Sequence, residues 1–518
     1  KNNSTGSIQK DSMRLTNKLQ HRCILLVGGG IFPLGLAPFD VWPAVIISMA
    51  ILFQSLKQTS AKHAFFNSLV YGFGLFIAGA SWLYVSIHEY GFIPAPLAIL
   101  ATALFCLFLA LIFAAPFMIT ALIPQNPLSL MLGLPAIWVI SEWMRTWILT
   151  GFPWLYAGYS HTSTWLNGWA PIGGVLLLSF ISGLGAMLLA SIVNGRIRSR
   201  STQSLMTTIA ILVVSGYFFQ NVEWTENTGE PLTVTLIQPN IPQNEKWSPG
   251  KQKLILKQLA SQTNAHWGSD IIVWPEAAVP TLPQRIPNFM SQMTDRANDS
   301  GSTLLTGIIT YDINQEKYHN SVLAIGENRG QYNKTRLVPF GEYVPVESAL
   351  RGLIKFFDLP MSSLAIGASD QPLFSIKDQL IATVICYEVV YPNLVARNSN
   401  EASLILTVSN DTWFGNSIGP LQHMQMVQMR ALENEKPIIR GTNNGISGLV
   451  DHKGKIRRRL DQHSSSELNG VVQAREGSTP FSTTGSWPIV LLSTLLCVWL
   501  IIKGIKTNVL EDPRHDNK

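Results

Sequence analysis

The sequence predicts a membrane bundle of helices joined to an α/β domain. Three observations support this fold class. The 518 residues are 47% hydrophobic and only 14% charged, which is a low share of charge for a soluble protein. Long apolar runs fill the first 220 residues and return near the C-terminus. The segment 221–485 lacks such runs and alternates short apolar stretches with helix-like ones.

Apolar runs that approach the ~20 residues of a membrane-spanning helix give a polytopic bundle of about eight spans. They lie at 23–39, 41–56, 64–87, 92–123, 128–149, 168–194, 204–220 and 487–503. Pro33, Pro38 and Pro43 interrupt the first two runs. We still count these runs, because neighbouring helices can satisfy the backbone groups that proline frees.

The basic residues predict the orientation of the bundle. Groups of Lys and Arg precede the first run and follow the second, sixth and last runs, which places them on one side if every run crosses. By the positive-inside rule this side is the cytoplasm. We therefore expect a cytoplasmic tail at 1–22, a bundle of about seven helices at 23–220, a periplasmic domain at 221–485, a last helix at 486–503 and a cytoplasmic tail at 504–518, in a bacterial inner membrane.

Composition also argues against several classes of function. The net charge of +6 is largely explained by the basic flanks of the spans, so we expect no nucleic-acid partner. The ten histidines are scattered without the spacing of a metal site. A phosphate-binding glycine loop is also missing from the sequence. We therefore expect no metal and no cofactor.

The segment 221–485 reads as strands that alternate with helices. Expected strands rich in Val, Ile, Leu and Thr lie at 233–240, 270–280, 302–310, 320–326, 380–388, 402–411 and 437–451, and expected helices include 251–266 and 421–436. Strands that are almost continuously apolar are typical of sheets covered on both faces. This pattern predicts an α/β or layered α+β sandwich.

Two expected strand ends carry ionisable residues. Glu276 follows an apolar strand and could act as a general base, or it could be an acid that favours a helix start. Lys334 ends another strand, where a lysine often only protects an edge from aggregation. The loop after it is shaped by Pro339, Gly341 and Pro345, which favours a functional role.

A third strand end carries Cys386, the only cysteine in the segment 221–485. It has no partner there for a disulfide, and an unpaired thiol in an oxidising compartment is either buried or functional. A buried structural cysteine is one reading. A nucleophile is the other, since a base and a cation that could serve it lie at the other two strand ends.

Four motifs carry a resemblance to a known family. WPEAAVP at 274–280, KTRLVPFGEYVP at 334–345 and ICYEVVYP at 385–392, followed by SNDTWFG at 409–415, resemble the catalytic motifs of the nitrilase superfamily. With the flanking spans, the chain resembles the membrane branch of that superfamily, the apolipoprotein N-acyltransferases. The resemblance implies an αββα sandwich in which Glu276 is the general base, Lys334 stabilises the transition state and Cys386 is the nucleophile.

The same resemblance implies supporting residues and a reaction. Glu342 would be a second acid near the lysine, and Tyr387 and Glu388 would shape the nucleophile's pocket. An acyl chain would pass from a membrane phospholipid to the cysteine as a thioester, and then to the α-amino group of the diacylglyceryl-cysteine of an apolipoprotein. Such a double transfer has ping-pong kinetics. We expect a monomer that contacts the bilayer.

Aromatic residues in polar loops are candidates for lipid contacts. The segment 146–169 is rich in Trp and Tyr, as interfacial segments are. Trp247 and Trp413 could contact acyl chains, although ordinary anchoring or core packing explains any single aromatic residue better.

The sequence also contains features of other functions, which are less well supported. GNSIG at 415–419, close to His423, matches a serine-hydrolase elbow, but it does not directly follow a strand. The basic run 453–459 fits a solvated edge strand better than an anion site. A membrane-tethered amidase or nitrilase would use the same three residues but would need only one span. A transporter would need ionisable groups in mid-span, whereas Glu142 and Arg145 lie near one end of theirs.

Overall fold

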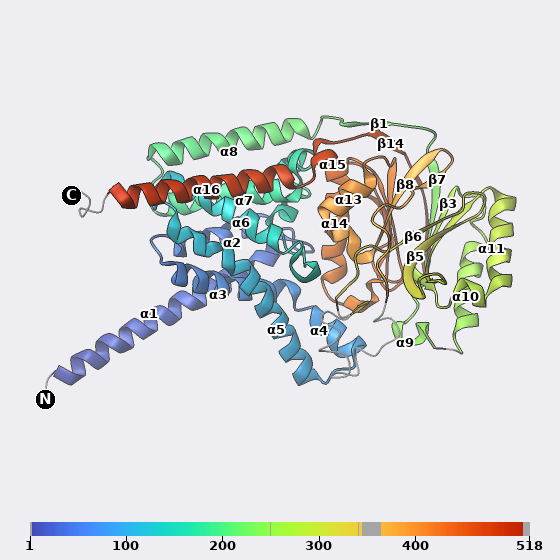
Figure 1. Ribbon diagram of the computed structural model, residues 1–518, viewed down its shortest axis with the longest axis horizontal. Helices are drawn as coiled ribbons and strands as arrows, with labels where there is room; N and C mark the ends of the chain where they lie inside the picture. Colours follow the sequence, from blue (N-terminus) through green and yellow to red (C-terminus); the bar gives the residue numbers. More distant parts are fainter. Residues whose placement is uncertain (1–2, 249, 340, 344–363, 511–518) are drawn as a thin grey trace.

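The chain folds into a helical bundle and a β-sandwich that lie side by side along the long axis of the molecule (Figure 1). The computed structural model describes residues 3–248, 250–339, 341–343 and 364–510. Helices α1 (Asn3–Ile31) and α16 (Trp487–Leu510) both extend away from the sandwich, at the far end of the bundle (Figure 1).

The bundle contains most of the predicted spans as long apolar helices. Six helices of the described chain have the length and hydropathy to cross a membrane, at Ala61–Ala80, Ala95–Leu122, Pro127–Met144, Trp165–Val193, Arg200–Phe219 and Trp487–Lys506. They contain α3 (Ala61–Ala80), α5 (Ala95–Ala114), α6 (Pro127–Met144), α7 (Ala170–Val193), α8 (Arg200–Phe219) and α16.

The first two predicted runs differ from the others. The run at 23–39 is divided between the end of α1 and a 3-10 helix, η1 (Phe32–Gly35), and the run at 41–56 forms the 13-residue helix α2 (Pro43–Ser55). Prolines at the starts of η1 and α2 explain the division, because proline lacks the N–H that a continuing helix requires. The bundle thus has six long apolar helices and two shorter apolar segments among the described residues.

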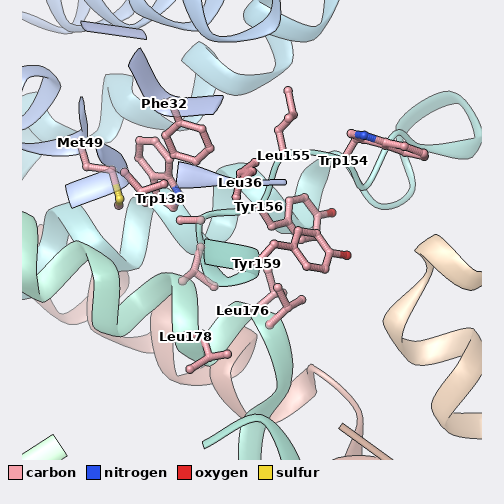
Figure 2. Packing of buried hydrophobic residues seen from close by; sticks show 14 of the residues in the cluster. Phe32, Leu36, Met49, Trp138, Trp154, Leu155, Tyr156, Tyr159, Leu176 and Leu178 are labelled. Atoms are coloured by element: carbon pink, nitrogen blue, oxygen red, sulfur yellow. The ribbon is translucent and has the colours of Figure 1, made fainter. Parts of the chain in front are cut away.

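Aromatic side chains fill the centre of the bundle (Figure 2). Trp138 of α6 is fully buried and stacks on Phe32 at a ring-centroid distance of 5.8 Å. The loop between α6 and α7 adds Tyr156 and Tyr159, whose rings stack at 5.9 Å. Aromatic pairs at these separations stabilise packing beyond the effect of the area that they bury. Such packing matters in a membrane bundle, because no hydrophobic effect drives its helices together.

The second part is a sandwich of two six-stranded sheets. One sheet has the order β12-β11-β10-β9-β8-β7 and the other β13-β2-β3-β4-β5-β6. The first contains β7 (Phe374–Ile376), β8 (Gln379–Ile385), β9 (Leu404–Ser409), β10 (Ile438–Thr442), β11 (Gly448–Val450) and β12 (Ile456–Arg459). The second contains β2 (Leu232–Gln238), β3 (Ile271–Val279), β4 (Thr303–Asp312), β5 (Lys317–Ile325), β6 (Gly330–Asn333) and β13 (Ser466–Val472).

Three parallel strands form the centre of each sheet, β2-β3-β4 and β8-β9-β10. Parallel neighbours need crossover connections. Helices α10 (Gln252–Thr263) and α11 (Pro287–Ser300) make these connections in one sheet, and α13 (Pro392–Ser399) and α14 (Gly419–Asn434) in the other. The α13 and α14 layer lies between its sheet and the bundle, and α10 and α11 lie on the far side (Figure 1). The αββα sandwich is therefore confirmed.

The expected strands agree with the observed ones apart from two details. The stretch 437–451 forms two antiparallel strands, β10 and β11. The stretch 380–388 stops at Ile385, because the backbone of Cys386 turns to a positive φ of 52°. The basic run 453–459 ends in β12, an exposed edge strand, as the solvated reading expected.

Helix α14 ties the sandwich to the bundle. Gln422 accepts hydrogen bonds from the indole N–H groups of Trp82 and Trp154, at 3.1 and 2.7 Å. At the end of the helix, the buried Glu433 accepts the N–H of Val175 at 2.8 Å, beside a break in α7. These bonds fix the distance between the membrane helices and the sheet that carries Cys386.

The aromatic segment 146–169 is only partly at the surface. Trp147 and Trp165 are 53% and 59% exposed, in keeping with an interfacial position. Trp154, Tyr156 and Tyr159 are instead buried in the bundle and against α14. The ends of the segment thus face the surroundings, whereas its middle is packing material between the two parts of the chain.

Candidate active site

Glu276 is placed by an irregularity in the middle of the second sheet. The pairing of β3 with β4 breaks between Trp274 and Val279, and Ala277 adopts a positive φ of 45°. The break turns the Glu276 side chain out of the regular alternation of the strand. Gly307 of β4 permits it, because a Cβ there would lie 2.4 Å from the carbonyl oxygen of Pro275.

Lys334 directly follows β6 and meets two carboxylates. Its Nζ donates to Glu342 Oε1 at 2.9 Å and to Glu276 Oε1 at 3.2 Å. The lysine is only 1% exposed. Asn320 of β5 donates from the same amide nitrogen to Glu276 at 2.8 Å and to Glu342 at 2.9 Å. An ammonium and an amide therefore bridge the two carboxylates from both sides.

The remaining oxygens of the two carboxylates are also bonded. Glu276 Oε2 accepts the backbone N–H of Asn410 at 2.8 Å, and Glu342 Oε2 accepts that of Val338 at 2.8 Å. The donors and the nearby cation favour the ionised form of Glu276 in spite of its burial. Its orientation is also fixed by these bonds.

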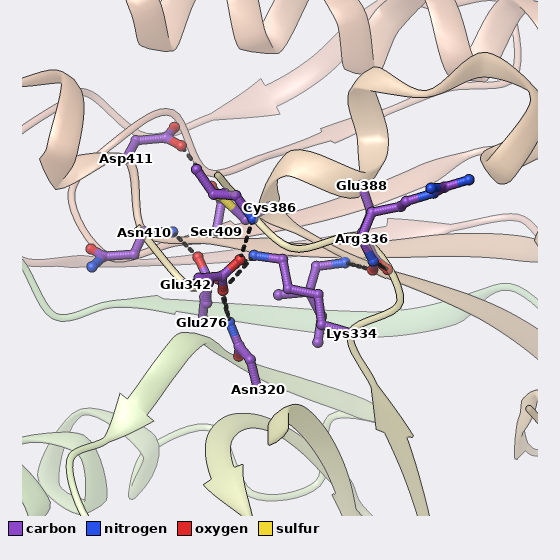
Figure 3. Close-up of polar contacts among 12 residues, drawn as sticks. Glu276, Asn320, Lys334, Arg336, Glu342, Cys386, Glu388, Ser409, Asn410 and Asp411 are labelled. Carbon is purple, nitrogen blue, oxygen red and sulfur yellow. Dashed lines mark hydrogen bonds and ion pairs between the residues drawn. The ribbon is translucent and has the colours of Figure 1, made fainter. Parts of the chain in front are cut away.

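Cys386 is the first residue after β8 and begins the short 3-10 helix η10 (Cys386–Val390). It is half-buried, and Figure 3 shows it in one cluster with Lys334, Glu276 and Glu342. A positive φ of 52° is unusual for a residue with a Cβ, and such strain is typical of functional turns. The strand end and the turn together place the thiol at the rim of the sheet.

The charges around the thiol set opposite shifts. Burial and the negative charge of Glu276 raise the pKa of the Cys386 thiol, although the charge of Lys334 opposes them. Burial would raise the pKa of Glu276, but Lys334, the Asn320 hydrogen bond and Lys246 lower it below its usual value. Burial disfavours the charged form of Lys334, yet the two carboxylates hold its pKa well above the usual value. At rest the site thus contains a protonated thiol beside an ionised carboxylate.

A second buried cation lies behind Glu276. Lys246, the last residue of the short helix α9 (Gln243–Lys246), donates its ammonium to the main-chain oxygen of Glu276 at 3.1 Å. Burial lowers the pKa of Lys246 to about 8, although Glu276 and Cys386 favour its charged form. The sequence around Lys246 gives no sign of this position, because a single lysine in a polar loop matches no motif.

The two residues after Cys386 lie in different places. Glu388 is fully buried and accepts the N–H groups of Ile385, Thr335 and Arg336 at 2.7, 2.6 and 3.1 Å. It therefore joins the loop after β6 to the turn after β8, and Figure 3 shows it apart from the Glu276 cluster. Tyr387 instead donates its hydroxyl to the carbonyl oxygen of Gly151 in the bundle, at 2.9 Å.

A buried polar network supports the other side of Cys386. Asp411, which follows β9, accepts a hydrogen bond from Arg440 at 2.8 Å and lies 3.2 Å from Nδ1 of His423. Burial acts against the charged form of Asp411, but the guanidinium of Arg440 and His423 hold its pKa far below the usual value. His423 lies 3.3 Å from the carbonyl oxygen of Cys386. Within this network, the imidazole of His423 is therefore the group that lies against Cys386.

The two candidate lipid contacts flank the site at unequal exposure. Trp247 is 38% exposed and directly follows Lys246. Trp413 is half-buried; its ring meets that of Tyr90 edge-on at 5.6 Å, and its carbonyl oxygen accepts a bond from Ser86. Trp413 thus packs against the bundle, and Trp247 has the freer ring.

The serine of GNSIG does not form a nucleophile elbow. Ser417 lies in a turn after the 3-10 helix η11 (Asp411–Phe414), and its hydroxyl accepts the N–H of Gly419. The nearby His423 lies beside Asp411 and faces the carbonyl oxygen of Cys386. In the described part of the chain, no cluster of His, Cys, Asp and Glu has the arrangement of a metal site.

Comparison with known proteins agrees with this architecture. Residues 28–188 match the apolipoprotein N-acyltransferase N-terminal domain, and residues 233–475 match the carbon-nitrogen hydrolase family. The chain is 42% identical to the apolipoprotein N-acyltransferase of Pseudomonas aeruginosa over 92% of this chain and 95% of that protein. It is 44% identical to that of Pseudomonas syringae pv. tomato, over 92% and 96% of the two chains.

Among solved structures, the chain is similar to Saccharomyces cerevisiae Nit3, a member of branch 10 of the nitrilase superfamily. That match has a TM-score of 0.37 and 15% identity, over 49% of this chain and 92% of Nit3. The relatives from Pseudomonas match this chain through both its bundle and its sandwich, at identities well above 30%. The chain belongs to the apolipoprotein N-acyltransferase family.

Proposed function

We propose that the chain N-acylates apolipoproteins in two steps through a thioester on Cys386, with a membrane phospholipid as the acyl donor. The observation that carries this proposal is the cluster of Glu276, Lys334 and Glu342 beside Cys386, in a member of this family. Base, cation and nucleophile are the three parts that covalent acyl transfer requires.

In the first step, the sulfur of Cys386 attacks the ester carbonyl of the phospholipid. The raised pKa of the thiol and the lowered pKa of Glu276 make free thiolate scarce, so the proton moves to Glu276 as the S–C bond forms. Lys334 stabilises the oxyanion, and its two carboxylate partners keep it charged. Protonated Glu276 then gives its proton to the departing glycerol oxygen, which leaves a thioester and a lysophospholipid.

In the second step, the neutral α-amino group of a diacylglyceryl-cysteine attacks the thioester. Glu276 takes a proton from the nitrogen and returns it to the sulfur as the C–S bond breaks. The amide product leaves with three acyl chains in total, and the free thiol is restored. In this scheme Glu342 takes no part in proton transfer. It accepts hydrogen bonds from Lys334 and Asn320 and holds both in place, which supports its role as a second acid beside the lysine.

The position of the site between sandwich and bundle supports a lipid substrate. The hydroxyls of Tyr387 and Tyr391 bond to the carbonyl oxygens of Gly151 and Thr150 in the loop after α6. The nucleophile's helix is therefore anchored to a loop of the membrane bundle, a few residues from the exposed Trp147. We propose a monomer in the inner membrane, with its sandwich in the periplasm and both termini in the cytoplasm.

A test uses purified protein in lipid nanodiscs and a synthetic diacylglyceryl-cysteinyl peptide. Phospholipid with a labelled acyl chain supplies the donor, and mass spectrometry follows the peptide. We expect the label on the α-nitrogen of the peptide, and no transfer to a peptide whose α-amino group is acetylated. Cys386→Ala is the control without a nucleophile.

The second candidate, a membrane-tethered C–N hydrolase, is favoured by the match of residues 233–475 to the carbon-nitrogen hydrolase family. It would use the same residues but would pass the acyl group to water. The same experiment separates the two, because a hydrolase releases labelled free fatty acid at the same rate with or without the peptide. That result would overturn the transferase proposal.

A further inference from the structure

We propose that His423 is a positioning residue that holds the peptide of Cys386 in the conformation needed for acylation, through a hydrogen bond to the cysteine's carbonyl oxygen. The inference rests on the proposed function, in which Cys386 is the nucleophile. It adds a residue of α14, outside the base, lysine and cysteine motifs, to the machinery of the reaction.

The neighbours of the imidazole determine which nitrogen carries its proton. Nε2 lies 3.3 Å from the carbonyl oxygen of Cys386, which can only accept a hydrogen bond. Nδ1 lies 3.1 Å from an amino group of Arg440, which can only donate one. A neutral ring with its proton on Nε2 satisfies both contacts. Nδ1 also lies 3.2 Å from an oxygen of Asp411. Asp411 does not need the histidine's proton, because Ser409 and Arg440 donate to its oxygens at 2.6 and 2.8 Å.

The environment favours this neutral form. Burial is the largest cause of the lowered pKa of His423, and the positive charge of Arg440 adds to it, against the opposing effect of Asp411. Since the ring is 1% exposed, water does not compete for Nε2. The imidazole therefore serves as a fixed donor to the cysteine's peptide and not as an acid or base.

The nucleophile needs such a donor because its backbone is strained. Cys386 has a positive φ of 52°, a conformation that a residue with a Cβ keeps only where its surroundings hold it. Glu388 holds the chain one residue before it, by accepting at 2.7 Å the N–H of Ile385, which belongs to the peptide between Val384 and Ile385. His423 holds the peptide after it. The two contacts fix both sides of the cysteine, and with them the direction of its side chain.

The same histidine lies against the membrane bundle. Its ring centroid is 5.6 Å from that of Trp154, and the neighbouring Gln422 accepts the indole N–H of Trp154. The residue that holds the nucleophile's peptide therefore rests on a side chain of the loop between α6 and α7. A displacement of that loop acts on Cys386 through one intervening ring.

Two substitutions separate the Nε2 bond from the rest of the network. His423→Gln keeps an amide N–H near the position of Nε2, whereas His423→Asn keeps a polar group only near Nδ1. Gln428→Asn is a matched control, because Gln428 lies on the same helix and bonds to the carbonyl oxygen of Gly454 instead. Single-turnover acylation of Cys386 by phospholipid is measured for each variant, together with KM for the lipid and Tm.

We expect His423→Asn to slow acylation about 10- to 100-fold at an unchanged KM, since small misplacements of a reacting group have effects of that order. His423→Gln should stay within about threefold of the wild type, as should Gln428→Asn. Acylation by His423→Asn at the wild-type rate would overturn the inference. So would equal losses in the Asn and Gln variants that simply follow their losses in Tm.

A second readout does not depend on the proposed function. The rate at which iodoacetamide alkylates Cys386, measured by peptide mapping, also depends on the direction of the thiol toward Glu276. We expect the same order of variants, with only His423→Asn slow. If the wild type forms no acyl-enzyme, the proposed function fails, while the alkylation rates still decide whether His423 positions the thiol.

Discussion

Replacement of Asn320 by leucine tests the electrostatic design of the site. The amide of Asn320 donates to Glu276 at 2.8 Å and to Glu342 at 2.9 Å, both in buried surroundings. Leucine has the same branching and the same number of side-chain heavy atoms, so the change removes the two hydrogen bonds without opening a cavity. It also leaves the carboxylates of Glu276 and Glu342 with one hydrogen bond fewer each. In the proposed mechanism, Glu276 accepts the thiol's proton.

The size of the effect follows from the hydrogen bond to Glu276. A bond to a charged group contributes about 1.5–3 kcal/mol, and one pKa unit corresponds to about 1.4 kcal/mol. Loss of the bond should therefore raise the pKa of Glu276 by about 1–2 units. Because that pKa is lowered in the folded protein, its ionised form is lost as the pH falls. The variant should lose its base at a higher pH than the wild type does.

The assay is single-turnover acylation of Cys386 across a series of pH values. We expect the acidic limb of the rate profile to move upward by about 1–2 pH units in Asn320→Leu. Gln331→Leu, an exposed amide on the neighbouring strand β6, is the matched control and should leave the limb in place. A uniform loss of rate with an unmoved limb would refute the reasoning, since it would show that Asn320 acts through geometry alone.

Three further changes test other parts of the site. Gly307→Ala brings a Cβ to within 2.6 Å of the Glu276 Cα, so single-turnover acylation should fall at least about 10-fold; an unchanged rate would mean that the strand irregularity does not set the position of the base. Lys246→Met removes a buried cation that lowers the pKa of Glu276, so the acidic limb should move upward, whereas a limb that moves downward would contradict the assigned sign. Asp411→Asn leaves the fully buried Arg440 without its anion and should lower stability by about 3–5 kcal/mol in denaturant titrations; a loss below about 1 kcal/mol would show that the pair contributes little.

The sequence was sufficient for the parts of the site that sit at strand ends. Cys386 directly follows β8, whose apolar pattern is visible in the sequence, whereas Lys334 follows the short polar strand β6. The motifs around both residues carry the family resemblance. An α/β or layered α+β sandwich and the membrane bundle were predicted because periodicity and apolar length are local signals. The αββα arrangement itself was implied by the family resemblance. The periplasmic orientation and the domain boundaries stay predictions.

The rest depended on contacts between segments far apart in the chain. Asn320 looks like one polar residue in an apolar strand, and Lys246 looks like one charge in a polar loop. Their importance arises from the break in β3, which turns Glu276 toward both of them. A break in strand register has no reliable sequence pattern apart from Pro275, so neither residue could be found from spacing alone.

For Glu388 and for the segment 146–169, the structure adds contacts that the sequence did not predict. The position of Glu388 two residues after Cys386 suggested that it shapes the pocket. In the structure its carboxylate accepts hydrogen bonds from the backbone N–H groups of Thr335, Arg336 and Ile385. Trp154 looked like an interfacial aromatic residue but is buried against His423. Hydropathy cannot distinguish a membrane surface from an apolar interface between two parts of one protein.

The acyl-enzyme is the central claim, and intact-protein mass spectrometry tests it most directly. The purified protein and Cys386→Ala are incubated with phospholipid before any acceptor is present. The account predicts a mass gain of one fatty acyl group on the wild type alone, which disappears when a diacylglyceryl-cysteinyl peptide is added. No adduct on the wild type, or an equal adduct on Cys386→Ala, would contradict the thioester mechanism.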